Sequence, residues 1–99
     1  MADRLEDSAT PGSQVRDLDT TALLVEPLSS AMRTKLAANG HKLSWRNPTV
    51  PDIYLFRRLF EEVDELMLAV KHGDRAEAWR EAADIANFAA MIADRTGEA

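Results

Sequence analysis

Acidic side chains recur at helical spacing in two places along the sequence. Glu62 and Glu65 are three residues apart, and so are Glu81 and Asp84. Residues three apart on a helix lie on the same side, so each pair would direct two carboxylates toward one neighbour. Converging carboxylates repel one another unless a positive group lies between them. The spacing therefore predicts a carboxylate cluster that needs a cation.

The surroundings of the second pair distinguish it from an ordinary solvated helix face. At about 100° per residue, Glu81 and Asp84 fall inside the apolar stripe that Ile85, Phe88 and Ile92 form. Burying an unpaired carboxylate costs several kcal/mol. This pair is therefore expected to face a compensating positive charge in the core.

Two kinds of cation could balance the cluster. One is a basic side chain, and the candidates near the acids in sequence are Arg57, Arg58, Lys71, Arg75 and Arg80. The other is a hard divalent ion, because Mg²⁺ binds oxygen ligands and favours sites that it shares with substrate phosphates. A carboxylate cluster in a helix bundle thus indicates a metal ion that holds a polyphosphate.

The first of three expected helices lies N-terminal to the acids. Apolar residues repeat every four positions over residues 28–38, which predicts a helix there. Asn39 and Gly40 tolerate the left-handed conformation that ends helices, so the helix should stop at this point. Residues 41–51 contain two prolines and no period, which is typical of a loop.

Two further helices carry the acidic pairs. Apolar residues at spacings of three and four from Ile53 to Val70 predict one helix, which begins with a capping box at Thr49, has Pro51 in its first turn and ends at residues 71–73. A second capping box that begins at Asp74 predicts another helix to about residue 95. The short connection at Gly73 would make these helices antiparallel, so that all four carboxylates converge.

The predicted fold is all-α, because no stretch alternates convincingly with a period of two. Residues 1–20 are rich in charged and turn-forming residues, and we expect a mobile N-terminal tail there. Residues 21–99 would form the helical domain. A core of this size is thin and the chain has no cysteine for a disulfide. We therefore expect an antiparallel helix bundle that is completed by homo-oligomerisation, as a dimer or a tetramer.

Composition excludes several classes of protein. The 99 residues carry a formal net charge of −5, which argues against a nucleic-acid partner. No apolar run reaches the roughly 20 residues that span a bilayer, and the N-terminus lacks the apolar segment of a secretory signal. We therefore expect a cytoplasmic protein without a membrane partner.

The two acidic segments match a known pair of motifs. Glu61-Glu62-Val63-Asp64-Glu65 fits Glu-Glu-x-x-Glu, Glu81-Ala82-Ala83-Asp84 fits Glu-x-x-Asp, and fifteen residues lie between them. In this order, on adjacent helices, they resemble the MazG-like, all-α nucleotide pyrophosphohydrolases. The run from residue 85 to 94 and the segment 42–45 are similar to short phage and bacterial members. The resemblance covers about residues 28–96.

The resemblance implies an Mg²⁺-dependent enzyme that hydrolyses (deoxy)nucleoside triphosphates to a monophosphate and pyrophosphate. It implies that the metal ligands are Glu62, Glu65, Glu81 and Asp84, with Mn²⁺ as an alternative ion. Glu61 and Glu62 would be the catalytic carboxylates that orient the attacking water and take its proton.

Three other residues are candidates for binding the nucleotide, and each has an ordinary structural alternative. Lys42 could pair with phosphate oxygens or be solvated in its loop. Trp45 could stack on a base or close the end of the bundle. Asn87 lies three residues after Asp84 and could bind phosphate or sugar, or be a polar residue at the margin of the stripe.

Two other functions remain open from the sequence. The chain could be a non-catalytic helical interaction module whose acids bind a basic partner, in which case the acids should point outward. It could also be a MazG-like enzyme that acts on a nucleotide-like substrate outside the triphosphates. The sequence identifies neither the base nor the biological role.

Overall fold

The computed structural model describes residues 19–39 and 45–96 of the chain, and its regular structure in these ranges is entirely helical. A π-helical turn, η3 (Thr21–Val25), leads directly into α2 (Glu26–Asn39). The longer helices α3 (Asp52–Lys71) and α4 (Arg75–Thr96) follow. The all-α prediction is confirmed, and α3 and α4 lie within about two residues of their expected bounds. The first helix was expected to start at residue 28, but helical structure already begins at residue 19 and continues through Pro27 into α2, so the predicted start is wrong.

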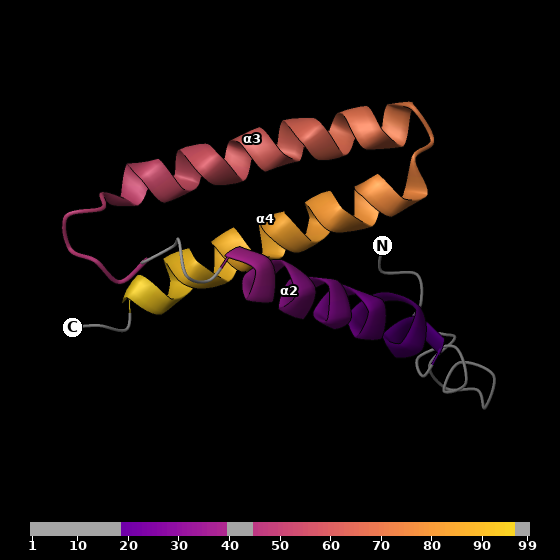
Figure 1. The fold of residues 1–99 in the computed structure, drawn as a ribbon, viewed down its shortest axis with the longest axis horizontal. Coiled ribbons are helices and arrows are strands. Elements are labelled where there is room, and N and C mark those ends of the chain that lie inside the picture. Colours follow the sequence, from indigo (N-terminus) through magenta and orange to yellow (C-terminus); the bar gives the residue numbers. More distant parts are fainter. Residues whose placement is uncertain (1–18, 40–44, 97–99) are drawn as a thin grey trace, which may run out of the picture.

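A tight turn makes α3 and α4 an antiparallel hairpin (Figure 1). Gly73 has a φ of +69°, which is the left-handed conformation expected of a glycine just beyond a helix end. The next helix starts with a side-chain cap, because Asp74 Oδ1 accepts the backbone N–H of Glu77 at 3.1 Å. The predicted turn and the predicted cap of α4 are both confirmed.

The start of α3 differs from the prediction. Pro51 precedes the helix in an extended conformation, and no side chain caps this end. Thr49 instead belongs to the preceding turn, where its backbone N–H and its hydroxyl both donate to Asn47 Oδ1, at 2.9 and 2.8 Å. The predicted capping box at Thr49 is wrong because the Asn47 amide engages both donor groups of this threonine.

The helix α4 lies in the middle of the described structure, with α3 along one side and α2 along another (Figure 1). Within residues 19–39 and 45–96, α2 and α3 both pack on α4 but not on each other. This arrangement leaves a cleft between α2 and α3 whose floor is α4.

The core is small and lies toward the C-terminal end of α4. Leu55, Phe88 and Met91 are its buried centre. The partly buried side chains packed around it are those of Trp45, Val50, Leu59 and Ile92. Several large apolar side chains of α3 remain exposed. Of the helices that the structure describes, none is long and apolar enough to cross a membrane.

The predicted tail falls almost entirely outside the described residues. Thr20, at its end, already has helical dihedral angles, with φ −63° and ψ −44°. The mobility of residues 1–18 stays a prediction.

Candidate metal centre

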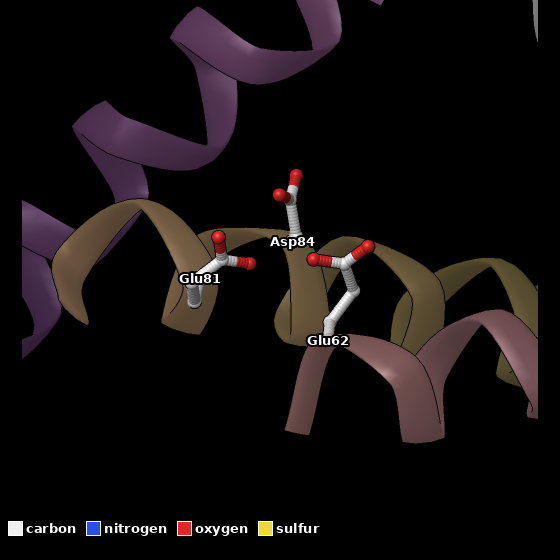
Figure 2. Close-up of side chains that lie close together, drawn as sticks. All are labelled: Glu62, Glu81 and Asp84. Carbon is white, nitrogen blue, oxygen red and sulfur yellow. The ribbon is translucent and has the colours of Figure 1, made fainter. Parts of the chain in front are cut away.

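Three carboxylates meet between α3 and α4. One oxygen each from Glu62, Glu81 and Asp84 lies within 4.8 Å of the other two. Figure 2 shows Glu62 extending from α3 and the other two side chains from α4. Glu62 is 9% exposed and Glu81 is 6% exposed, while Asp84 is partly buried. A solvated acidic face would not bury its carboxylates, so this arrangement needs a positive charge.

Helix periodicity explains why these acids are inside. On α3, Leu55, Glu62 and Ala69 are spaced by seven residues and all three are buried against α4. Glu81 and Phe88 have the same spacing on α4 and are also buried. Seven residues are about two helical turns, so each acid occupies a position that the helix pattern assigns to the core.

Burial dominates the electrostatics of Glu81. Its pKa is raised to about 9, first because burial removes the carboxylate from water and then because Glu62 and Glu77 are close to it. Its Oε1 atom is buried and has no hydrogen-bond partner among the described residues. Without a cation this group would hold a proton at neutral pH, whereas a bound metal ion would stabilise the carboxylate.

Two basic side chains balance part of the cluster. Lys35 Nζ, from α2, lies 3.1 Å from Asp84 Oδ2. Arg58 Nη2 lies 3.4 Å from Glu62 Oε2, and its Nη1 lies 2.5 Å from Glu61 Oε1. Burial raises the pKa of Asp84, and the neighbouring ammonium of Lys35 offsets only part of this shift. Arg58 was among the basic candidates expected from sequence, but Lys35 was not.

Lys35 escapes sequence reasoning because it is distant in sequence from every acid of the cluster. Its only local signal is its place in a predicted helix next to Leu36. Which face of that helix meets α4 is a matter of tertiary packing. Proximity in sequence to the acids therefore does not predict the contact between Lys35 and Asp84.

The fourth predicted ligand, Glu65, shares a group with only one of these three, Glu81. An oxygen of Glu65, which is exposed, groups within 4.8 Å of oxygens from Glu77 and Glu81 instead. The four predicted ligands are therefore distributed over two adjacent groups that share Glu81. Glu77 is the acid that sequence reasoning missed, because its position three after Asp74 indicated only a helix start.

The cleft beside the three carboxylates has a volume of about 400 Å³. Glu62 and Asp84 lie in the wall of this cleft together with Lys35 and Arg58. The cleft is therefore lined by two of the acids and by both basic side chains that pair with them. The rest of the lining is mixed apolar and polar: Leu36, Asn39, Tyr54, Asn87, Phe88 and Met91.

The predicted nucleotide-binding residues occupy different places. Asn87 is buried in the cleft lining and donates a hydrogen bond from Nδ2 to the Met32 carbonyl at 3.3 Å, which ties α4 to α2. Trp45 packs on the core and donates from Nε1 to Asp94 Oδ2 at 2.8 Å. Lys42 lies outside the described residues. Their roles in binding stay predictions, as do those of Glu61 and Glu62 in catalysis.

An antiparallel helical hairpin with clustered carboxylates on its facing sides defines the class of all-α, MazG-like nucleotide pyrophosphohydrolases. Within this class the chain belongs to the phosphoribosyl-ATP pyrophosphohydrolase family, whose sequence model matches residues 34–97. The match includes both carboxylate groups and Lys35, and it confirms the resemblance inferred from the paired motifs. No curated relative and no solved structure matches the chain.

Proposed function

We propose that this protein is an Mg²⁺-dependent hydrolase that cleaves the triphosphate chain of a nucleotide between the α and β phosphates. The products are a monophosphate and pyrophosphate. The observation that carries this proposal is the cluster of three carboxylates, of which Glu62 and Glu81 are buried and Glu62 and Asp84 line a cleft, in a member of a pyrophosphohydrolase family. An acidic interaction module would hold its acids outward, so the burial of Glu62 and Glu81 favours the enzyme.

The donor set fits a hard divalent ion. All three groups are carboxylates, and Glu81 Oε1 is a buried oxygen without a hydrogen-bond partner among the described residues. Glu62, Glu81 and Asp84 would hold Mg²⁺, with Mn²⁺ as the alternative. When bound, the ion offsets the phosphate charge and polarises the α-phosphoryl group. Glu61, which is exposed beside Glu62 and pairs with Arg58, would help to orient the attacking water, and a carboxylate would take its proton.

Lys35 and Arg58 are the phosphate-binding side chains in this proposal. Both line the cleft, and each now pairs with a carboxylate of the metal centre. A metal ion on Asp84 and Glu62 would replace these ion pairs. The ammonium and the guanidinium would then be available to phosphate oxygens, which a guanidinium can bind in a bidentate manner.

Two substrate types share this chemistry. The first is a (deoxy)nucleoside triphosphate, with the base against the apolar part of the cleft near Tyr54 and Phe88. The second is phosphoribosyl-ATP, which the name of the matching family supports. Both would lose pyrophosphate from the same triphosphate chain.

We further propose that the active form is a homo-oligomer. Ile53, Phe56, Phe60 and Met67 follow one another at helical spacing on α3, and all four are exposed. The rings of Phe56 and Phe60 lie 6.3 Å apart, so the exposed face includes a neighbouring aromatic pair. A second copy that covers this face would complete the bundle.

Turnover of a nucleotide panel tests the activity. The panel contains the common ribo- and deoxynucleoside triphosphates and phosphoribosyl-ATP, with Mg²⁺, and the assay separates pyrophosphate from orthophosphate. We expect pyrophosphate and the matching monophosphate from at least one substrate, and no product with Glu62→Gln or Asp84→Asn. Orthophosphate as the product, or wild-type rates in either variant, would contradict the proposal.

A further inference from the structure

The guanidinium of Arg58 lies over the ring of Phe88, across the interface between α3 and α4. Its Cζ atom is 5.2 Å from the centre of the ring. A cation within about 6 Å of a ring centre is attracted by the negative face of the ring. Both side chains line the cleft beside the carboxylates. The contact therefore connects the core of the protein to a basic side chain of the cleft.

The two partners of this contact differ in their freedom to move. Phe88 is 8% exposed and packs with Leu55 and Met91 at the buried centre of the core. A close-packed ring of this kind has a fixed position. The side chain of Arg58 is 35% exposed, and a long side chain loses conformational entropy when it is ordered by a ligand. A fixed ring that already holds the guanidinium reduces this loss.

The other contacts of Arg58 would compete with a phosphate. Its Nη2 atom lies 3.4 Å from Glu62 Oε2, and its Nη1 atom binds Glu61 Oε1. Both ion pairs use the N–H groups that phosphate oxygens would need. The ring of Phe88 attracts the charge of the guanidinium and needs no N–H donor. The contact with Phe88 can therefore persist when phosphate oxygens replace the carboxylates.

Lys35, the other basic side chain of the cleft, lacks this support. It pairs with Asp84, and the cation–π contact found in residues 19–39 and 45–96 belongs to Arg58 alone. An ammonium also carries its donors on a flexible stem, whereas the guanidinium is planar and rigid. Of these two cations, Arg58 is thus the one whose position the core determines.

We propose that Phe88 is a positioning residue for phosphate binding: its ring holds the guanidinium of Arg58 at the cleft, with its N–H groups available to phosphate oxygens of the substrate. This inference rests on the proposed function, which places the triphosphate chain in this cleft. It gives Phe88 a role beyond packing in the core, and this role is exercised through Arg58.

Binding of inorganic triphosphate to the full chain, with Mg²⁺, tests this role by calorimetry. The probe has no base, so it reports phosphate binding alone. Replacing the ring of Phe88 by its pentafluoro derivative keeps the shape of the side chain but removes the negative face of the ring. We expect the Kd to rise roughly two- to thirtyfold. Phe88→Leu, which keeps an apolar side chain without a ring, should weaken binding in the same way.

A double-mutant cycle separates positioning from packing. In the Arg58→Gln background, fluorination of Phe88 should leave the Kd unchanged, because the guanidinium on which the ring acts is absent. Ile92→Val is the control for a loss of packing, since Ile92 packs on the same core but does not line the cleft. It should lower the melting temperature and keep the wild-type Kd. Circular dichroism verifies that each variant is folded.

The possible results separate this inference from the proposed function. An unchanged Kd in the fluorinated protein would overturn the inference, and so would an equal loss of affinity with and without Arg58. Binding that depends on both residues, without turnover of any nucleotide in the panel, would support the positioning role and overturn the proposed function. No binding of triphosphate to the wild type would overturn both.

Discussion

Glu81 is the central side chain of the carboxylate cluster. It belongs to both carboxylate groups, it is almost completely buried, and one of its oxygens has no partner among the described residues. A residue of this kind lowers the stability of the metal-free protein, because burial penalises its charge. In the proposed metal site, the same feature would make Glu81 a strong ligand. The burial of Glu81 would thus explain both the lower stability of the metal-free protein and the affinity of the site for a metal ion.

Replacing Glu81 by glutamine tests this dual role. Glu81→Gln keeps the shape of the side chain but removes its charge, so we expect the metal-free variant to melt at or above the wild-type temperature. Mg²⁺ should raise the melting temperature of the wild type by mass action and leave that of the variant unchanged. Differential scanning calorimetry with and without Mg²⁺ measures both effects. Equal Mg²⁺ stabilisation of the two proteins would exclude Glu81 as a ligand.

Lys35 pairs with Asp84, so in the proposed mechanism it would compete with the metal ion for this carboxylate and would attract a phosphate of the substrate. Lys35→Met should strengthen Mg²⁺ binding in the absence of nucleotide, because Asp84 loses its ion pair. It should raise the KM for the substrate by roughly ten- to a hundred-fold, the equivalent of about 1.5–3 kcal/mol for a charge-assisted hydrogen bond. Calorimetry measures the first effect and steady-state kinetics the second.

Lys71→Met is the matched control for this experiment. Lys71 is exposed at the end of α3 and does not line the cleft. If Lys35→Met weakened Mg²⁺ binding, its ion pair would support the metal centre rather than compete with it. An unchanged KM would remove Lys35 from phosphate binding.

At the scale of elements, the loop before α3 is attached to the end of α4 by a polar cluster. Asp94 accepts hydrogen bonds from Arg46 and from the Trp45 indole, and this cluster holds Trp45 against the core. Arg95 donates to the backbone carbonyls of Trp45 and Val50, both at 2.6 Å. These contacts close the end of the bundle opposite the α3–α4 turn.

The Asp94 cluster predicts a specific dependence of stability on pH. The Arg46 guanidinium, and then the Trp45 indole, lower the pKa of Asp94 from 3.8 to about 2. Its folded-state pKa is thus below its unfolded value, so its stabilisation is complete above about pH 4 and is lost as the pH falls toward 2. Asp94→Asn should melt below the wild type at neutral pH, and the difference should vanish near pH 2.

Thermal unfolding followed by tryptophan fluorescence over this pH range measures the Asp94 effect. Asp64→Asn is the control, because Asp64 is exposed on α3 and lies outside the Asp94 cluster. A difference between Asp94→Asn and the wild type that persisted unchanged at pH 2 would show that the charge of Asp94 is not its source.

At the scale of the whole molecule, the described helices do not cover their own apolar surface. Phe60 is 60% exposed on α3, beside the equally accessible Ile53 and Met67. Large apolar patches on a small protein mark interaction sites. The face of α3 that packs on α4 carries the acids, and the neighbouring face is available to a second copy.

Phe60→Arg tests this interface. A charge at the centre of the exposed face should shift the protein toward monomers and leave its helix content unchanged, since Phe60 is not part of the core. Arg75→Glu, an exposed charge change at the start of α4, is the control. Light scattering coupled to size exclusion measures the mass. A wild-type chain that is monomeric at all concentrations would contradict the proposed oligomer.

The sequence by itself determined the helices, the α3–α4 turn and the paired motifs. These features are local, because apolar spacing, a glycine at a helix end and a capping aspartate act over a few residues. The burial of Glu81 was also predicted, since Glu81 falls inside the apolar stripe of its helix. Asp84 was expected in the same stripe and is only partly buried, and the burial of Glu62 was not predicted. The family followed from the same residues, because the motifs are contiguous in sequence.

Only the tertiary structure decided which groups meet across helices. It paired Lys35 with Asp84 from a distant segment, placed Glu65 with Glu77 rather than with Asp84, and turned Thr49 toward Asn47. Each outcome depends on the rotation and offset of one element against another. Sequence spacing fixes neither quantity, because it gives the face of a helix on which a side chain lies but not the neighbour that this face meets.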